Sequence, residues 1–290
     1  MTAWNGFINV CDGGDEWPAG AQVREVNRPL VLRLLPDRLR VAAWSRLYRP
    51  ASERWHPLYR AASLKLAPRI TMDLVPGDLI SDCIAFTGVY DLELSRHLLQ
   101  FVGRGEVMID VGANLGYFSL LWAAANPASR CFAFEASPRT IDLLKRNVAR
   151  NGLDARVQVL SQAAGREHGS LLFDVGPPEQ TGWGGFAATS GASAISVEVV
   201  RVDEVVTNVD EVALLKIDIE GADTWALMGC ERLLRERRIK SLWFEQNKPR
   251  MRALGIGERE AEDYLRSVGY LPSPRSDPSR DVVGWSAIPV

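Results

Sequence analysis

The sequence predicts an α/β protein whose mostly parallel β-sheet is covered by helices on both faces. Short apolar runs typical of buried strands recur along most of the chain, and stretches with helical periodicity separate them. The 290 residues are 47% hydrophobic and 24% charged, an ordinary balance for a soluble globular protein with one sizeable core. Ligands of such a sheet bind at the carboxyl ends of the strands, where the strand order reverses. The residues that end each strand are therefore the informative ones.

The strands and helices of this core are expected from about residue 70 onward. The predicted core strands comprise residues 106–111, 130–135, 155–160, 212–218, 240–245 and 282–289. The predicted helices comprise residues 115–125, 137–151, 224–235 and 258–267. The second helix has the clearest ends, with Ser137 as N-cap, Pro138 at the first position and Gly152 just beyond the last. An extra strand pair is expected over residues 170–174 and 195–200, on either side of a long loop.

Two segments are candidates for covering a site. Residues 1–69 are expected to form an amino-terminal helical extension or lid, and residues 70–290 the main domain. Residues 36–50 read as a basic amphipathic helix, followed by a second helix that Pro57 breaks. These helices either pack on the core as surface helices or form a lid. The loop over residues 176–194, rich in Gly, Ser and Ala, is either a functional lid or a disordered insertion.

Charge and composition disfavour several classes of protein. The formal net charge of −2 argues against a protein that binds polyanions through bulk charge. No apolar run approaches the roughly 18 residues of a membrane-spanning helix, so no membrane partner is expected. Four widely separated cysteines without a CxxC pair argue against a disulfide framework or a structural zinc site. No secretory signal is recognisable, so we expect a cytoplasmic protein.

The residues after the first two core strands point to a nucleoside ligand. The first strand leads into DVGANLG (residues 110–116), whose glycines permit a tight turn and a close approach of a ligand to the backbone. Asn114 stands where a dinucleotide fingerprint needs glycine, which argues against a pyrophosphate. Glu135 ends the second strand, where a carboxylate can accept both hydroxyls of a ribose. S-adenosylmethionine is a nucleoside without phosphates, and its positive sulfonium suits an acidic pocket.

These motifs carry a specific resemblance. From about residue 70 to residue 270 the sequence resembles the FkbM family of S-adenosylmethionine-dependent methyltransferases. The matching segments are VMIDVGANLGYFSLL, CFAFEASPRTIDLLKRNVARNGL, VQVLSQAAG, VEVVRVDEVV, LLKIDIEGADTWALMGCERLL and SLWFEQN. The resemblance implies a Rossmann-like class I methyltransferase sheet whose last strand is antiparallel. It also implies methyl transfer from S-adenosylmethionine, most often to an oxygen of a sugar or natural product.

The resemblance implies a set of cofactor-binding residues. They are Thr87 and Tyr90 at the methionine end; Asp110, Gly112, Ala113, Asn114 and Gly116 along the methionine half; Glu135, Ala136 and Ser137 at the ribose and adenosine; Gln162 and Ala163 at the adenine; and Asp218. The chain departs from the family pattern twice. Ala136 replaces a frequent proline, and Asp223 replaces the usual glutamate, which puts a direct catalytic role of residue 223 in doubt.

The catalytic candidates are the acids that follow the fourth and fifth strands, Asp218, Glu220 and Glu245. An alcohol acceptor must lose its proton during attack, and a carboxylate can assist that loss. Glu220 is the preferred general base, with capping of the next helix as the alternative. Asp218 is expected to face the ammonium group of the cofactor or the acceptor. Asp218, Glu245 and Asn247 together could hold a divalent cation, although a polar rim without a metal is favoured.

The predicted function is methylation of a hydroxyl or carboxylate on a sugar or natural-product small molecule. Trp183, Phe186 and Asn247 are expected to contact that acceptor. A nucleic-acid or peptide acceptor is the alternative. Nucleic acid is disfavoured, because DIEG (residues 218–221) stands where base-flipping methyltransferases carry an Asn/Asp-Pro-Pro-aromatic turn. A nicotinamide oxidoreductase is disfavoured by Asn114. A non-catalytic binding module is disfavoured by the acids that follow the strands. Whether the protein forms a homo-oligomer is left open.

Overall fold

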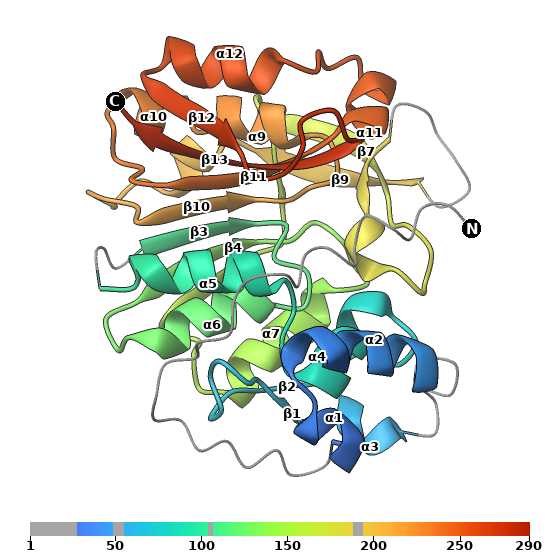
Figure 1. Cartoon of the computed structure of the whole chain (residues 1–290). Coiled ribbons are helices and arrows are strands. Elements are labelled where there is room, and N and C mark those ends of the chain that lie inside the picture. The colour runs from blue at the N-terminus through green and yellow to red at the C-terminus, as the bar shows by residue number, and fades with distance from the viewer. Residues whose placement is uncertain (1–27, 49–54, 104–106, 188–193) are drawn as a thin grey trace.

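A seven-stranded sheet forms the centre of the molecule in the computed structural model, which describes residues 28–48, 55–103, 107–187 and 194–290 (Figure 1). The strand order is β12-β13-β11-β10-β3-β4-β5. Their bounds are β3 Val107–Val111, β4 Arg130–Phe134, β5 Val157–Leu160, β10 Leu214–Ile217, β11 Leu242–Asn247, β12 Tyr270–Pro274 and β13 Val282–Pro289. The neighbours from β11 to β5 pair in parallel, whereas β13 is antiparallel to both β11 and β12. The mostly parallel sheet with an antiparallel last strand is thus confirmed.

The order of the strands places a ligand site between β3 and β10. From β3 the chain proceeds outward through β4 and β5 and then returns to β10 on the other side of β3. The loops after β3 and β10 therefore leave the sheet on opposite faces and open a crevice at the carboxyl ends of these strands. The sequence-level expectation of a strand-end site agrees with this topology.

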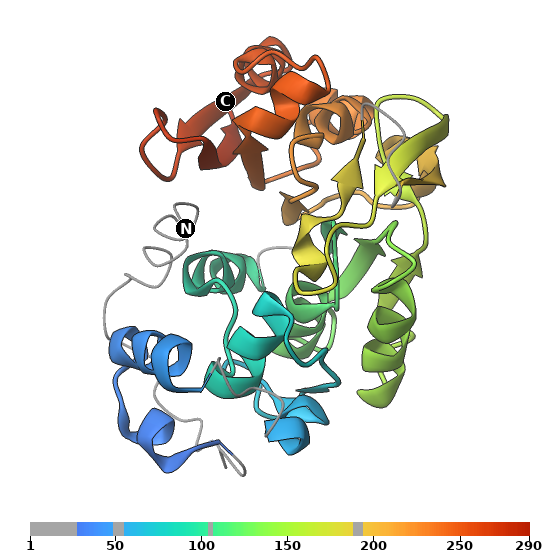
Figure 2. The ribbon, with the colours of Figure 1, turned by 90° about the vertical axis from the view of Figure 1, so that its right-hand side faces the viewer.

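Helices bury both faces of the sheet. Met108 of β3 joins the apolar core beneath the helices α4 to α7, while Val107, Ile109 and Val111 join the core on the opposite face. All five residues of β3 are buried, as expected for a central parallel strand. The helices of the first face are α4 Leu79–Thr87, α5 Leu92–Phe101, α6 Tyr117–Ala125 and α7 Ile141–Arg150; those of the second are α9 Asp223–Met228, α10 Glu231–Arg235 and α12 Glu260–Ser267. Figure 2 shows the two layers separated by the sheet.

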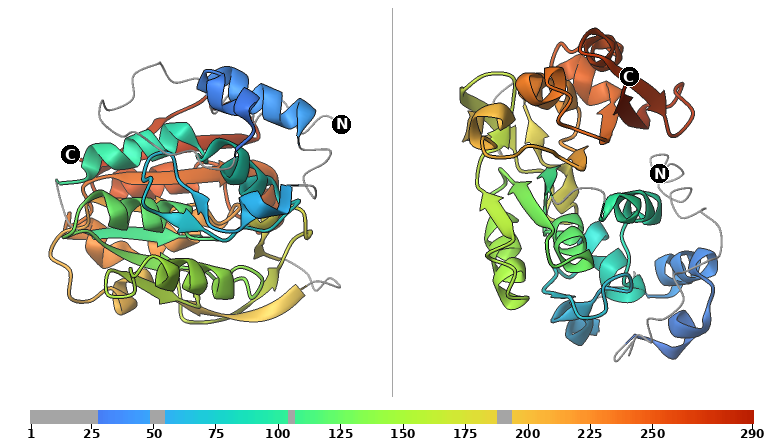
Figure 3. Two further views of the ribbon diagram at one scale, coloured as in Figure 1. Left: turned by 90° about the horizontal axis from the view of Figure 1, so that it is seen from below. Right: turned by 90° about the vertical axis from the view of Figure 1, so that its left-hand side faces the viewer.

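The amino-terminal elements lie on the α5–α7 side of the sheet (Figure 3). They are α1 Leu30–Leu34, α2 Asp37–Leu47, α3 His56–Tyr59, β1 Ala62–Ser63 and β2 Thr71–Met72, and α2 and α3 pack on α4. The helix expected from residue 36 is confirmed. The second expected helix is wrong beyond its first turn, because the chain turns at Ala61, with a φ of 57°, into β1. Residues 1–27 and 49–54 of the expected extension lie outside the described residues.

A smaller four-stranded sheet, in the order β6-β9-β7-β8, stands beside the main one. Its strands are β6 Ala163–Ala164, β7 Gly169–Asp174, β8 Gly185–Phe186 and β9 Ala194–Val200. The predicted pairing of residues 170–174 with 195–200 is confirmed as the antiparallel β7–β9 ladder. Between β7 and β8 lies a segment with one turn of 3-10 helix, η3 Thr181–Trp183. We call residues 177–186 the lid segment.

Several element ends differ from the expectation. The helix expected from Ser137 begins at Ile141, because residues 137–140 form a turn in which the Ser137 backbone carbonyl accepts from the Thr140 amide. The single helix expected over 224–235 is two, α9 and α10, separated at Gly229. Strand β12 was not expected, since Pro272 and Pro274 argue against a central strand; it is an edge strand. Two further short helices, α8 Val202–Val205 and α11 Lys248–Ala253, complete the fold.

The described helices include none that is both long and apolar enough to cross a membrane.

Candidate active site

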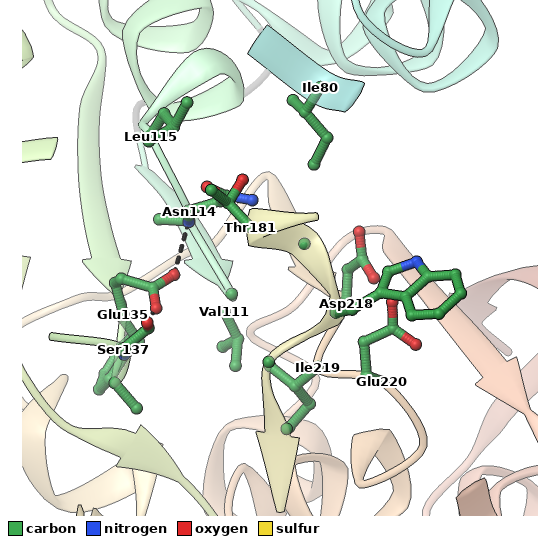
Figure 4. A pocket seen from close by; sticks show the side chains of 18 of the residues that line it. Ile80, Val111, Asn114, Leu115, Glu135, Ser137, Thr181, Asp218, Ile219 and Glu220 are labelled. Atoms are coloured by element: carbon green, nitrogen blue, oxygen red, sulfur yellow. Dashed lines mark hydrogen bonds between the residues drawn. The ribbon is translucent and has the colours of Figure 1, made fainter. Parts of the chain in front are cut away.

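A pocket opens at the carboxyl ends of β3, β4, β10 and β11, roofed by the lid segment (Figure 4). Most of the residues expected to bind cofactor or acceptor line it. Those lining residues are Tyr90, Gly112, Ala113, Asn114, Glu135, Ala136, Ser137, Gln162, Ala163, Trp183, Phe186, Asp218, Glu220 and Glu245. Thr87, Asp110, Gly116 and Asn247 do not line it. None of the described residues between 28 and 69 lines the pocket either; the predicted division of the chain at residue 69 stays a prediction.

The turn after β3 approaches β10 closely. Gly112 has a φ of 79°, and a Cβ atom built there would stand 2.0 Å from the backbone carbonyl oxygen of Asp218. Only glycine fits, since both the conformation and the space exclude a side chain. Asn114 also has a positive φ, 51°, a conformation that asparagine tolerates better than most residues. This close contact between the two turns brings Asp218 beside the glycine turn.

Glu135 is held in place by two backbone amides. Its Oε2 accepts from the amide of Asn114 at 2.7 Å, and its Oε1 accepts from the amide of Ser137 at 2.7 Å (Figure 4). Burial raises the pKa of this carboxyl, and the two amide hydrogen bonds act against that rise. Each carboxylate oxygen has a second lone pair, so both can accept another hydrogen bond. The side chain can therefore receive a pair of neighbouring hydroxyls, as a ribose presents.

Asp110 lies beneath the pocket and not in its wall, so its expected place along the methionine half is wrong. It stands directly opposite Lys216 in the β3–β10 register, and their Oδ1 and Nζ atoms are 3.1 Å apart. Ser119 of α6 donates to its Oδ2 at 2.6 Å. Lys216 also donates to the carbonyl of Gly112 at 3.0 Å. Burial lowers the pKa of Lys216, but the neighbouring acids, Asp110 first and then Asp218, raise it more, so the charged form of Lys216 is favoured where it braces the glycine turn.

Gly116 and Thr87 also serve the fold and not the pocket wall. A Cβ atom at Gly116 would stand 2.6 Å from Cδ1 of Leu144, so this glycine lets the start of α6 pack on α7. The hydroxyl of Thr87 lies 2.6 Å from the carbonyl of Cys83 and 2.8 Å from that of Val89, within the end of α4. Tyr90, just beyond, does line the pocket, and burial together with Asp218 raises the pKa of its hydroxyl.

The end of the pocket that we expect to border the adenine lies beyond β5. Gln162 and Ala163 line the pocket there, beside Ala136 and Ser137 from the end of β4. The side-chain amide of Gln162 donates to Oε1 of Glu198 at 2.9 Å, which ties this corner to β9. Ser137 is not the helix cap that we expected; its hydroxyl accepts from the amide of Arg139 at 3.3 Å within the turn.

Glu220 combines an unusual backbone with a perturbed carboxyl. Its φ of 56° lies in the left-handed region, which a non-glycine residue adopts at a cost that functional sites commonly carry. The side-chain amide of Asn247 donates to Oε2 at 2.8 Å, and this is how Asn247 acts on the site from outside the pocket wall. Burial and then Asp218 raise the pKa of Glu220 to about 7, against the lowering effect of Arg250 and Asn247. The helix-capping alternative is wrong, since Ala222 is the N-cap of α9.

Other acids crowd the same end of the pocket. Burial, then Asp218 and Glu220, raise the pKa of Glu245 well above its ordinary value. Asp223 accepts from the amides of Gly221 at 3.2 Å and Glu245 at 3.3 Å, and so supports the turn; a direct part in catalysis is not indicated. Within the described ranges, no three or more His, Cys, Asp or Glu side chains are arranged to hold a metal ion. A site without a metal stays a prediction.

Hydrogen bonds hold the lid segment from two sides of the pocket. On the α4 side, the amide of Thr181 donates to Oδ1 of Asp78 at 2.7 Å, and the amide of Leu79 donates to the carbonyl of Glu179 at 3.2 Å. On the other side, the Arg250 guanidinium donates to the carbonyl of Trp183 at 2.8 Å. Residues 180–186 of the long loop thus line the pocket and form its roof, as expected for a lid. Residues 188–193 lie outside the described residues.

Sequence reasoning missed several residues of this site. Gln180, Thr181 and Ile80 line the pocket but stand in a polar loop and at a helix start that carry no distinctive motif. Lys216 did carry a signal, since it is the one cation in the apolar run VALLKID. Arg250 carried none, because α11 is too short to show periodicity.

Three buried polar atoms in the pocket wall have no partner within the described chain: Oδ1 of Asn114, Oε1 of Gln180 and Oγ1 of Thr181. Two of them belong to the lid segment and one to the glycine turn beneath it. The lid passes close to this turn, since a Cβ atom at Gly182 would stand 3.7 Å from Nδ2 of Asn114. Buried polar groups normally have hydrogen-bond partners, so these atoms fit a polar ligand enclosed between turn and lid. Together with Glu135 and the acids, they suit a cationic nucleoside such as S-adenosylmethionine.

Comparison with known proteins decides the family. Residues 110–272, more than half of the chain, match the family model described as the methyltransferase FkbM domain. The chain belongs to the FkbM methyltransferase family. Two curated relatives are methyltransferase sdnD of Sordaria araneosa, 27% identical over 155 residues, and methyltransferase 1 of Beauveria bassiana, 28% identical over 146 residues. Each alignment covers 43% of this FkbM chain, and 60% and 58% of the two relatives.

Solved structures with a similar arrangement include an FkbM methyltransferase from Methylobacillus flagellatus KT, 16% identical with a TM-score of 0.45. That match covers 77% of this FkbM chain and 57% of the other. A precorrin-6y C5,15-methyltransferase from Geobacter metallireducens is 14% identical with a TM-score of 0.39, over 69% of this chain and 90% of the other.

Proposed function

We propose that this FkbM protein is an S-adenosylmethionine-dependent O-methyltransferase that acts on a hydroxyl or carboxylate of a small polar molecule, a sugar or a natural product. One observation carries the proposal. A carboxylate held by two amides beside a glycine turn, Glu135, and a carboxyl with a pKa of about 7, Glu220, line the same roofed pocket. The first suits a ribose and the second suits proton removal from an acceptor.

The cofactor-binding groups are arranged from the adenine end to the methionine end. Gln162 and Ser137 border the adenine, Glu135 receives the ribose hydroxyls, and Asn114 faces the polar groups beyond them. When bound, S-adenosylmethionine supplies a methyl group that is already activated by a positive sulfonium. The protein therefore has to orient the acceptor in line with that methyl carbon and exclude water. Asp218 and the aromatic ring of Tyr90 form the surface of the pocket where that positive charge is most favoured.

Glu220 is suited to take the acceptor proton. A general base works best when its pKa lies near the working pH, and about 7 meets that condition. For a hydroxyl acceptor, the bound cofactor would supply the methyl group, the methyl–sulfur bond would break with its electron pair left on sulfur as a neutral thioether, and the acceptor oxygen would gain the methyl group as its proton goes to the Glu220 carboxylate. Burial and the neighbouring acids raise the pKa of Glu245 well above its ordinary value, which favours its protonated form. In that form Glu245 can donate a hydrogen bond to the acceptor.

A small acceptor suits this pocket better than a polymer. The lid segment passes over the pocket and is fastened on both sides, so an acceptor must fit beneath or beside it. Trp183 and Phe186 line this part and offer apolar surface to a ring. The names of the curated relatives say only that they are methyltransferases. A peptide or nucleic-acid acceptor is therefore an outcome for the acceptor screen to reveal.

Calorimetric titration of the purified protein with S-adenosylmethionine, and with NAD as control, tests the cofactor. We expect S-adenosylmethionine to bind and NAD not to bind. Transfer of a labelled methyl group to a panel of sugars, phenols and carboxylic acids then tests the acceptor class. Binding of NAD alone, or of neither molecule, would contradict the proposed cofactor; transfer only to protein or nucleic acid would contradict the acceptor class.

A further inference from the structure

One arginine joins the lid segment to the proposed general base. Arg250 lies on α11, directly after β11. Its Nη2 donates to the backbone carbonyl of Trp183 at 2.8 Å, and its Nε stands 3.6 Å from Oε2 of Glu220. The planar guanidinium can direct separate N–H groups at two acceptors, which the point charge of a lysine cannot do as well. A single side chain thus contacts both the roof and the chemistry of the site.

The surroundings of Arg250 hold it in this position. A Cβ atom at Gly185 would stand 3.0 Å from Nη1 of Arg250, and a Cβ atom at Gly221 would stand 2.7 Å from the Cβ of Arg250. Two glycines therefore leave the space that the arginine occupies. Asn247 supports both partners, since its Nδ2 donates to Glu220 at 2.8 Å and its Oδ1 caps the amide of Arg250 at 3.5 Å.

The groups that act on the charge of Glu220 come from three elements. Burial and then Asp218, at the end of β10, disfavour its ionised form. Arg250 on α11 favours the ionised form, and the Asn247 hydrogen bond does the same. The guanidinium that favours the ionised form of Glu220 is therefore the same group that is bound to the lid segment.

We propose that Arg250 is a positioning residue that ties the lid segment to Glu220, so that closing the lid also places a positive charge beside the general base. The base is then ready to accept a proton only when the pocket is roofed and water is excluded. This inference rests on the role of Glu220 in the proposed function. It concerns a contact between two parts of the protein, however, and can be measured without an acceptor.

Two variants separate the charge of Arg250 from its bridging geometry. Arg250→Ala removes both, whereas Arg250→Lys keeps the charge but cannot hold Glu220 and the Trp183 carbonyl together. Arg252→Ala is the matched control, because Arg252 is on the same helix and pairs with Glu258 at 2.7 Å, away from the pocket. Two readouts are needed: hydrogen exchange of lid residues 179–186 by mass spectrometry, and the titration midpoint of Glu220 by carboxyl-carbon NMR, assigned with Glu220→Gln.

We expect lid exchange to be about 10-fold faster or more in both Arg250 variants, as loss of a charge-assisted hydrogen bond implies. We expect the Glu220 midpoint to move to higher pH in Arg250→Ala and to stay near the wild-type value in Arg250→Lys. The coupling is reciprocal, so Glu220→Gln should also change lid exchange. Lid exchange in Glu220→Gln therefore tests the coupling even if an Arg250 variant fails to fold.

The proposal is overturned if Arg250→Ala changes only one of the two readouts, or neither. It is also overturned if Glu220→Gln leaves lid exchange unchanged, or if Arg252→Ala reproduces the Arg250 effects. None of these results depends on methyl transfer. A protein that shows the coupling but binds no S-adenosylmethionine would therefore contradict the proposed function and leave the coupling standing.

Discussion

The two carboxylates that carry the proposed chemistry differ in what holds them. Glu135 accepts from two backbone amides, so its position is fixed by the chain on both sides of it. Glu220 instead faces Asp218 within a buried surface, and only Asn247 and Arg250 oppose the rise of its pKa. Two glutamates that follow the strands on either side of β3 thus suit different tasks, binding and proton transfer, because their environments differ.

Replacing Glu135 by Gln should weaken S-adenosylmethionine binding by about 10- to 100-fold, the loss expected for hydrogen bonds to a charged group. A glutamine also presents an NH₂ group to a backbone amide donor, so the turn at Asn114 is disturbed. Calorimetry measures the effect. Glu211→Gln is the control, because Glu211 pairs with Lys240 at the opposite end of β10. Equal affinity in wild type and Glu135→Gln would contradict the ribose assignment.

Replacing Glu220 by Gln should lower turnover by about 100-fold or more with any acceptor that the screen identifies. Cofactor affinity should change little, because Glu135 and the glycine turn remain. In the wild type, turnover should fall as the pH drops through about 7, since protonated Glu220 cannot act as a base. Initial rates between pH 5 and pH 9 measure both effects. A variant with normal turnover but weakened cofactor binding would assign Glu220 to binding instead.

Strands β3 and β10 are joined by a buried ion pair as well as by their backbone ladder. Asp110 and Lys216 face each other in register, and both side chains are almost fully buried. A buried pair contributes little net stability by itself, because both ions lose their hydration. Its value here is positional, since Lys216 also binds the carbonyl of Gly112 and so fixes the glycine turn.

Breaking this pair should cost more than removing it. Asp110→Asn removes the nearest carboxylate from the buried Lys216 charge and leaves only Asp218, at 3.9 Å, so it should lower the free energy of unfolding by about 3–5 kcal/mol. The double variant Asp110→Leu with Lys216→Met removes both charges and should recover most of that loss. Urea unfolding measures the free energies. If the double variant is as unstable as the single one, the pair is stabilising in its own right.

At the scale of the whole molecule, several acids are buried near one end of the sheet, and ionising them lowers the stability of the folded state. Burial first of all raises the pKa of both Asp91 and Glu220 to about 7. The folded state then binds protons more tightly than the unfolded chain, so raising the pH through this range favours unfolding. His97 acts in the opposite sense, because burial lowers its pKa to about 4, but its effect is complete by about pH 6.5.

The melting temperature should therefore fall between about pH 6 and pH 8. Glu220→Gln should melt higher than the wild type at pH 8, and the two should converge below about pH 4.5, where both states of Glu220 are protonated. Thermal unfolding followed by circular dichroism at each pH measures this. The raised pKa values of these acids in the folded state would be contradicted by a wild-type melting temperature that rises from pH 6 to pH 8. They would also be contradicted if the difference in melting temperature between wild type and Glu220→Gln did not depend on pH.

Local patterns in the sequence were enough to predict the class of fold and the strand ends at which the site lies. Apolar runs that end in Asp218 or Glu135, and a glycine turn after β3, are features of neighbouring residues, so they can be read without coordinates. The same holds for the paired strands β7 and β9 and for the family resemblance. Element ends were less readable, as Ser137 and Gly229 show, because turn hydrogen bonds and helix packing decide them.

Only the tertiary structure decided which of these residues face the pocket. Asp110 and Gly116 belong to the motif, but Asp110 pairs with Lys216 and Gly116 leaves room for Leu144. Arg250 belongs to no motif, yet it contacts both the lid and Glu220. The pKa of Glu220 likewise depends on Asp218, Asn247 and Arg250, which three elements bring together. The sequence by itself determined which strands end in functional residues, because strand periodicity and turn chemistry are local. Side-chain contacts between elements, and the burial that perturbs a carboxyl, arise only when the chain is folded.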